Sequence, residues 1–170
     1  IDHQIVDSSV IFAYPPRWNK ADEDPNSVTF APESDQTILV VAAKDGSFIQ
    51  VVADGSTEML KRGVLTFTPE DVDVEFHEEG ILAAPFRPAY LTALMHVDGQ
   101  PVSMLTTYAT DGRQILLVLL MNNGQSTISE TDFATVTQLI QSVSFGQDTQ
   151  INMTVMDQET VNLLPTPTAV

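Results

Sequence analysis

The residues best suited to chemistry lie in one acidic run, Asp71-Val72-Asp73-Val74-Glu75-Phe76-His77-Glu78-Glu79. Alternate residues of a β-strand point to the same face. A strand over this run would therefore have one apolar face and one face that carries four carboxylates and an imidazole. The apolar face would hold Val72, Val74 and Phe76, and the polar face Asp71, Asp73, Glu75, His77 and Glu79. Such a row is a candidate for binding a hard cation such as Ca²⁺ through oxygen ligands.

A straight strand spreads these side chains apart, whereas a cation site needs ligands that converge from several directions. Runs of charge are usually solvated faces, and carboxylates are rarely buried without a partner. We therefore expect a half-buried strand whose acidic face contacts a partner through Asp71, Asp73, Glu75 and Glu79. No cofactor is expected; Ca²⁺ is the alternative, with Asp71, Asp73, Glu75 and His77 as its candidate ligands.

A second acidic cluster, Asp22-Glu23-Asp24, lies between Trp18 and Pro25. Asp residues beside Pro are typical of turns, so the cluster is expected to be solvated and on a loop. It is also a candidate addition to a cation site or to a docking patch for a basic partner.

Two aromatic residues are further candidates for partner contact. Trp18 closes the segment Tyr14-Pro15-Pro16-Arg17-Trp18. Tyr and Trp combine an apolar body with a polar tip, which suits both packing and interfaces. Packing is the expected role of this segment, with Trp18 kept as a candidate contact. Phe86, in the Pro-flanked bend Ala83–Pro88, is the other candidate.

The histidines give little support for catalysis. His3, His77 and His96 do not form a His-Glu-x-x-His motif, and the sequence has no Gly-x-Ser-x-Gly elbow or Gly-rich phosphate loop. No catalytic residue is therefore assigned. A hydrolase with a dispersed site is an alternative, and it would need a Ser or Asp within hydrogen-bond reach of His77 or His96.

Composition narrows the classes of partner. The chain has 170 residues, 43% of them apolar, which suits one domain. Its formal charge is −16, from 7 basic and 23 acidic residues. This balance argues against nucleic acid and against an anionic membrane surface. The longest apolar stretch, Ile115–Met121, is too short to span a membrane, and the absence of Cys excludes disulfides and thiolate metal sites.

The second half of the chain predicts a three-stranded meander followed by a helix. The strands are expected at Ala89–Val97, Pro101–Ala109 and Arg113–Met121, because Asp98-Gly99 and Asp111-Gly112 are typical of tight hairpin turns. The third strand is apolar on both faces, which predicts a central position with helices on both sides. Ser129-Glu130-Thr131-Asp132 is a capping-box pattern that begins a helix.

The first half predicts strands at Val10–Tyr14, Ser27–Ala31 and Thr37–Ala43. Residues 45–62 allow two interpretations. Asp45-Gly46 and Asp54-Gly55 can be turns around a strand, or Ser47 can cap a helix that continues with a second turn through Thr57–Arg62.

The order of these features resembles the PsbP/Mog1-like superfamily, including its bacterial secreted and lipoprotein members. The resemblance rests on Phe12-x-Tyr14-Pro15-x-x-Trp18 near the start and on a helix followed by Ser142-x-Ser144-Phe145 at the end. It covers about residues 5–146. It implies an α+β fold in which a central antiparallel sheet is flanked by helices on both faces, and this favours the helical interpretation of residues 45–62. It also implies an accessory or binding subunit rather than an enzyme.

We therefore expect a PsbP/Mog1-like domain over residues 1–146 and a C-terminal extension over 147–170 that ends in alternating Pro and Thr. The expected function is that of a non-enzymatic, extracytoplasmic accessory subunit. It would use the acidic face and the C-terminal tail to dock on a protein partner, such as a basic surface of a membrane-associated complex. The scarcity of lysine, the non-Met first residue and the resemblance favour an extracytoplasmic location. Binding of Ca²⁺ or of a small ligand is the alternative.

Overall fold

A computed structural model describes residues 1–4, 10–43 and 57–146 of the protein. The elements within these ranges are, in chain order, β1 (Asp2–Gln4), β2 (Val10–Ala13), β3 (Lys20–Asp24), β4 (Ser27–Phe30), β5 (Gln36–Ala43), α2 (Glu58–Thr66), β6 (Val74–Ile81), β7 (Ala89–Val97), β8 (Gln100–Thr110), β9 (Ile115–Asn123), α3 (Glu130–Ser142) and β10 (Ser144–Phe145). The C-terminal extension predicted at 147–170 lies outside the described residues.

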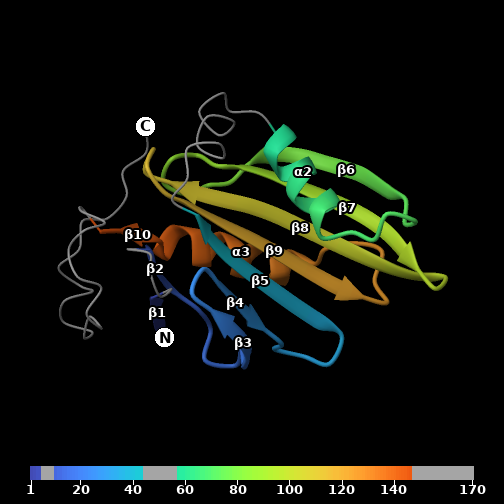
Figure 1. The fold of residues 1–170 in the computed structure, drawn as a ribbon, viewed down its shortest axis with the longest axis horizontal. Helices are drawn as coiled ribbons and strands as arrows, with labels where there is room; N and C mark the ends of the chain where they lie inside the picture. Colours follow the sequence, from blue (N-terminus) through green and yellow to red (C-terminus); the bar gives the residue numbers. More distant parts are fainter. Residues whose placement is uncertain (5–9, 44–56, 147–170) are drawn as a thin grey trace.

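Most of these strands form one antiparallel sheet with the order β3-β4-β5-β9-β8-β7-β6 (Figure 1). A small sheet, β1-β2-β10, joins the start of the chain to the segment after α3. The protein is thus mostly β-sheet with two described helices. The outermost strands of the large sheet are β3 and β6.

The predicted meander is present as β7, β8 and β9. The two hairpins reverse at Asp98-Gly99, where φ is 52° and 78°, and at Gly112, where φ is 90°. Positive φ is the conformation that tight hairpin turns require and that Gly adopts at little cost. The Asp-Gly pairs therefore located both turns from the sequence alone.

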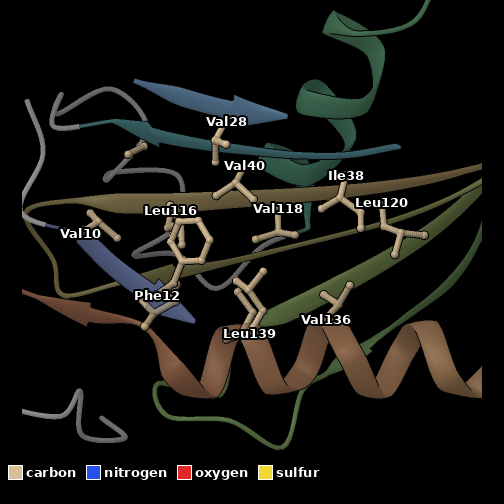
Figure 2. Packing of buried hydrophobic residues seen from close by; sticks show 14 of the residues in the cluster. Val10, Phe12, Val28, Ile38, Val40, Leu116, Val118, Leu120, Val136 and Leu139 are labelled. Atoms are coloured by element: carbon tan, nitrogen blue, oxygen red, sulfur yellow. The ribbon is translucent and has the colours of Figure 1, made fainter. Parts of the chain in front are cut away.

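The apolar strand β9 lies at the centre of the sheet, between β5 and β8. Its residues Leu116, Val118 and Leu120 belong to the same buried cluster as Val136 and Leu139 of α3 (Figure 2). Its alternate residues belong to other clusters, in which Ile115 joins Met59 and Leu60 of α2, and Leu119 joins Val64. Packing on alternate residues explains why β9 is apolar along nearly its whole length.

Local sequence signals located the start of α3 and part of α2. The Ser129 hydroxyl accepts a hydrogen bond from the Asp132 backbone N–H at 3.1 Å, which caps α3 as the sequence predicted. Residues 58–62 are helical in α2, in agreement with the helical interpretation of that part of 45–62. The rest of the ambiguous segment lies outside the described residues. Neither described helix has the length and apolar character of a membrane span.

Candidate functional site

The acidic run forms an exposed edge, and its alternation holds as far as Phe76. Asp71 and Asp73 precede β6, which begins at Val74 rather than at Asp71. Both are exposed, as is Glu75, whose side chain retains 69% of its accessible surface. The intervening Val72, Val74 and Phe76 are half-buried against the cluster that contains Val64 of α2.

A β-bulge then breaks the predicted alternation. Phe76 pairs with Ala93 and Glu79 with Leu91, so two residues, His77 and Glu78, stand opposite the single residue Thr92. The Thr92 hydroxyl accepts a hydrogen bond from the Glu78 backbone N–H at 3.0 Å.

The extra residue moves Glu79 to the α2 side of β6, away from Glu75. Its carboxylate accepts a hydrogen bond from Thr57 Oγ1 at 3.1 Å and lies 3.1 Å from Lys61 Nζ. The Lys61 ammonium holds the pKa of Glu79 below its usual value. The prediction that Glu79 shares a face with Asp71, Asp73 and Glu75 was therefore wrong, because the bulge changes the side-chain phase by one residue.

The second acidic cluster lies in a strand and not on the loop that was predicted. Asp22, Glu23 and Asp24 belong to β3, which pairs antiparallel with β4, and all three residues are exposed. The Asp24 carboxylate accepts hydrogen bonds from the backbone N–H groups of Asn26 and Ser27 at 2.8 and 2.9 Å, which closes the turn to β4. A hydrogen bond from the Ser27 hydroxyl, together with these two backbone bonds, lowers the pKa of Asp24.

The two acidic clusters lie at opposite edges of the large sheet. β3 and β6 are its outermost strands, with five strands between them. The clusters therefore do not form one surface, and a partner would contact either the β3 edge or the β6 edge.

Trp18 is a core residue. Its side chain is only 4% exposed, and its ring centroid lies 5.5 Å from that of Phe30, which itself packs against Tyr14 at 4.6 Å. The structure thus contradicts the candidate partner contact at Trp18, because the chain reverses after Pro15-Pro16 and folds the indole under β4.

Phe86 is half-buried rather than fully exposed, in a loop with an unusual backbone. Phe86 and Arg87 have φ of 68° and 46°, which non-Gly residues adopt rarely. Hydrogen bonds hold the loop in place: the Arg87 N–H donates to Ala84 O at 3.0 Å, and Gln141 Nε2 of α3 donates to Ala83 O at 2.7 Å.

The candidate metal ligands do not gather. Within residues 1–4, 10–43 and 57–146, no group of three carboxylate or imidazole side chains is close enough to hold a metal ion. His77 Nε2 lies 3.3 Å from Glu75 Oε2 on the exposed edge, and His96 is exposed at the end of β7. Among the described residues, no hydrogen bond or ion pair joins His77 or His96 to a Ser or Asp side chain.

Sequence reasoning missed a polar network beside the start of α3. Gln36 of β5 stands opposite Asn122 of β9, and its amide donates to Asn122 Oδ1 at 2.9 Å and to Asp132 Oδ1 at 3.0 Å. The Asn122 amide donates to Asp132 Oδ2 at 2.8 Å. These residues line a polar pocket of about 290 Å³ together with Arg17, Glu33 and Asp35. Because Gln36 and Asp132 are 96 residues apart, no local motif indicates their contact.

No protein-family model matches the sequence, and no curated protein matches it. Solved structures do. The Saccharomyces cerevisiae Ran-binding protein Mog1p superposes with a TM-score of 0.59 and 6% identity, over 85% of this chain and 94% of Mog1p. A variant of the protein Mog1 gives a TM-score of 0.50 and 10% identity, over 83% and 85% of the two chains.

The chain has the PsbP/Mog1-like fold. A protein from Bacteroides thetaiotaomicron is similar as well, with a TM-score of 0.57 and 11% identity over 86% of this chain. The chain spans about half (48%) of that longer protein. At such low identity the likeness establishes the PsbP/Mog1-like fold and leaves the function to be argued from the residues.

Proposed function

We propose that this protein is a non-enzymatic accessory subunit that acts outside the cytoplasm and binds a partner protein through an acidic surface at the β6 edge. We define the β6 acidic surface as Asp71, Asp73 and Glu75. The observation that carries the proposal is that all three carboxylates are exposed at the edge of the sheet, and that no Lys or Arg nitrogen of the described residues lies within 4.0 Å of them.

Surface carboxylates that have no Lys or Arg partner attract a basic protein over a distance of about one Debye length, roughly 8 Å at physiological salt. Such charges mainly raise the association rate and select the partner, whereas apolar contacts supply most of the affinity. The β3 edge carries carboxylates too, but Glu23 there is paired with Lys20, and Asp24 is engaged in its turn. The β6 edge is therefore the better docking surface.

The fold is shared with a protein that binds a protein partner. Mog1p, which shares the fold, is described as a Ran-binding protein. The extracytoplasmic location is supported by the scarcity of lysine and by the resemblance to secreted and lipoprotein members of the superfamily. The C-terminal tail, residues 147–170, is the predicted second contact with the partner.

The layered arrangement of the fold is part of the same proposal. We infer that α2 and α3 cover opposite faces of the large sheet, because each packs on alternate residues of β9. Since Val72, Val74 and Phe76 pack toward α2, the carboxylates of the β6 acidic surface would point away from α2.

The test is co-purification of the full-length protein from its natural source at low and high salt, with mass spectrometry of the proteins that accompany it. The docking variant is Asp71→Asn/Asp73→Asn/Glu75→Gln. A matched control, Glu33→Gln/Asp35→Asn/Glu130→Gln, removes three exposed charges elsewhere.

We expect a stoichiometric partner that high salt releases, that the control retains and that the docking variant loses. Cell fractionation should find the protein outside the cytoplasm. A monomer with no salt-sensitive partner, or equal loss in both variants, would overturn the proposal.

A further inference from the structure

The polar pocket beside the start of α3 carries a charge that its own residues do not balance. Its lining includes three carboxylates, those of Glu33, Asp35 and Asp132, and one cation, Arg17. The formal charge of these four side chains is therefore −2. Among the described residues, no ion pair within 4.0 Å involves any of them. A cationic ligand would neutralise the pocket, whereas an anionic ligand would be repelled.

The buried side of the pocket has acceptor atoms that no donor occupies. Asn122 is 4% exposed, and Gln36 and Asp132 are half-buried. Both N–H groups of the Gln36 amide are used, one toward Asn122 and one toward Asp132. Its Oε1 atom is left as an acceptor, and no donor among the described residues reaches it. Each Asp132 carboxylate oxygen accepts one amide N–H and can accept one more. The ligand that fits is therefore a hydrogen-bond donor as well as a cation.

Arg17 lies at the border of the pocket. It also lines a second, more open groove, together with Pro15, Pro16 and residues of α3. Because it belongs to both linings, its positive charge lies at the rim that the pocket shares with this groove. Glu33 and Asp35 are exposed, whereas Asp132 is half-buried. The charged group on the buried side of the pocket is thus the Asp132 carboxylate.

The separation of the acceptors selects the kind of cation. In the described ranges, no group of three carboxylate or imidazole side chains could hold a metal ion, so the carboxylates of the pocket do not converge on one point. An ammonium group is likewise a compact charge. A guanidinium group is planar and directs five N–H donors outward in a fork, so it can reach acceptors that lie apart. The pocket volume, about 290 Å³, lies at the lower end of the range of small-molecule sites.

We propose that this pocket binds a small molecule that carries a guanidinium group. The guanidinium donates to the Asp132 carboxylate and to Gln36 Oε1, while Glu33 and Asp35 attract it from the rim. Hydrogen bonds between a guanidinium and a carboxylate are among the strongest in proteins, because both partners are charged. The pocket shares no residue with the β6 acidic surface. The inference therefore goes beyond the proposed function and does not depend on it.

The test is an NMR titration of the full-length, isotope-labelled protein with L-arginine. The side-chain amide signals of Gln36 and Asn122 report on the pocket directly. L-Citrulline has nearly the same shape without the charge, and L-lysine has the charge without the planar fork. We expect L-arginine to shift both amide signals in a saturable way and to bind at least about tenfold more tightly than either control compound. No saturable shift of these signals, or equal binding of L-lysine or L-citrulline, would overturn the inference.

Variants locate the binding. Glu33→Gln/Asp35→Asn removes the two rim charges and should weaken L-arginine binding severalfold, and its fold should be retained because both side chains are exposed. Asp132→Asn should abolish the saturable shift. Glu70→Gln/Asp98→Asn removes two exposed charges outside the pocket and should bind L-arginine like the natural protein. Unchanged binding by the rim variant would contradict the inference, whether or not Asp132→Asn folds.

The docking control Glu33→Gln/Asp35→Asn/Glu130→Gln connects this inference with the proposed function. It should retain the co-purified partner and bind L-arginine weakly, because the ligand is a small molecule and not the partner. If this variant loses the partner, an Arg side chain of the partner occupies the pocket, and the assignment to a small molecule is overturned. If no partner co-purifies but L-arginine binds as expected, the proposed function fails and this inference stands.

Discussion

The ring of Tyr90 lies across the backbone of Gly80, its partner on the neighbouring strand. A Cβ atom at position 80 would lie 2.6 Å from Tyr90 Cε1 and 2.7 Å from its hydroxyl oxygen. The ring is held from two other sides. Its hydroxyl donates to Glu78 Oε1 at 2.6 Å, and its centroid lies 4.8 Å from that of Phe133 in an edge-to-face contact. A glycine at position 80 therefore leaves room for the Tyr90 ring, which contacts both Glu78 of β6 and Phe133 of α3.

Gly80→Ala should lower the free energy of unfolding by about 1–3 kcal/mol, the usual cost of forcing an extra methyl group into packed surroundings. The added methyl would displace the Tyr90 ring from Glu78 and Phe133. Urea unfolding followed by circular dichroism measures the change. Gly63→Ala is the control: it has open space around the new methyl and should stabilise α2 by up to about 1 kcal/mol. Equal stability of the Gly80→Ala variant and the natural protein would contradict the close packing.

Asp132→Ala should destabilise the protein through Asn122, which is only 4% exposed. The substitution removes the acceptor of the Asn122 and Gln36 amides. A buried polar group left without its partner costs about 1–3 kcal/mol. The measurement is the unfolding midpoint in urea at neutral pH.

Glu130→Ala is the control for this prediction, because Glu130 also lies in the first turn of α3 and is exposed. Both substitutions remove a negative charge from the helix N-terminus, an effect of about 0.3–1 kcal/mol. The difference between the two variants therefore reports on the hydrogen bonds of the network. Identical losses would show that the network adds nothing to stability.

His3 should make folding stability depend on pH. Its ring packs against Phe12 at 5.7 Å between centroids, and its Nε2 lies 3.1 Å from Glu23 Oε1. Burial lowers the pKa of His3 below 6.5, although Glu23 opposes part of the shift. The unfolded chain then binds the proton more readily than the folded protein. The contribution of neutral His3 is fully present above about pH 6.5 and is lost as the pH falls toward the folded pKa.

The measurement is urea unfolding of the natural protein and of His3→Gln between pH 5 and 7.5. The natural protein should lose more stability than the variant on acidification. A parallel pH dependence of the two proteins would show that His3 does not titrate between the folded and unfolded states.

Local sequence signals were enough to locate several elements of the fold. Asp98-Gly99 and Gly112 supply the positive φ of two hairpins, and the Ser129 side chain caps α3, because turns and caps depend on a few adjacent residues. The apolar pattern of β9 likewise predicted a central strand, since a strand between two others that packs on alternate residues has few polar positions.

Tertiary structure alone decided how the acidic residues are distributed. Strand order, which depends on contacts between distant segments, placed the two acidic clusters on the opposite edge strands β3 and β6. One extra residue opposite Thr92 turned Glu79 toward Lys61, and neither residue type nor period signals such a bulge. Trp18 is buried against the ring of Phe30. Asp132 accepts a hydrogen bond from Gln36, which lies 96 residues away in the sequence. These outcomes follow from long-range packing, in which a side chain's surroundings come from other parts of the chain.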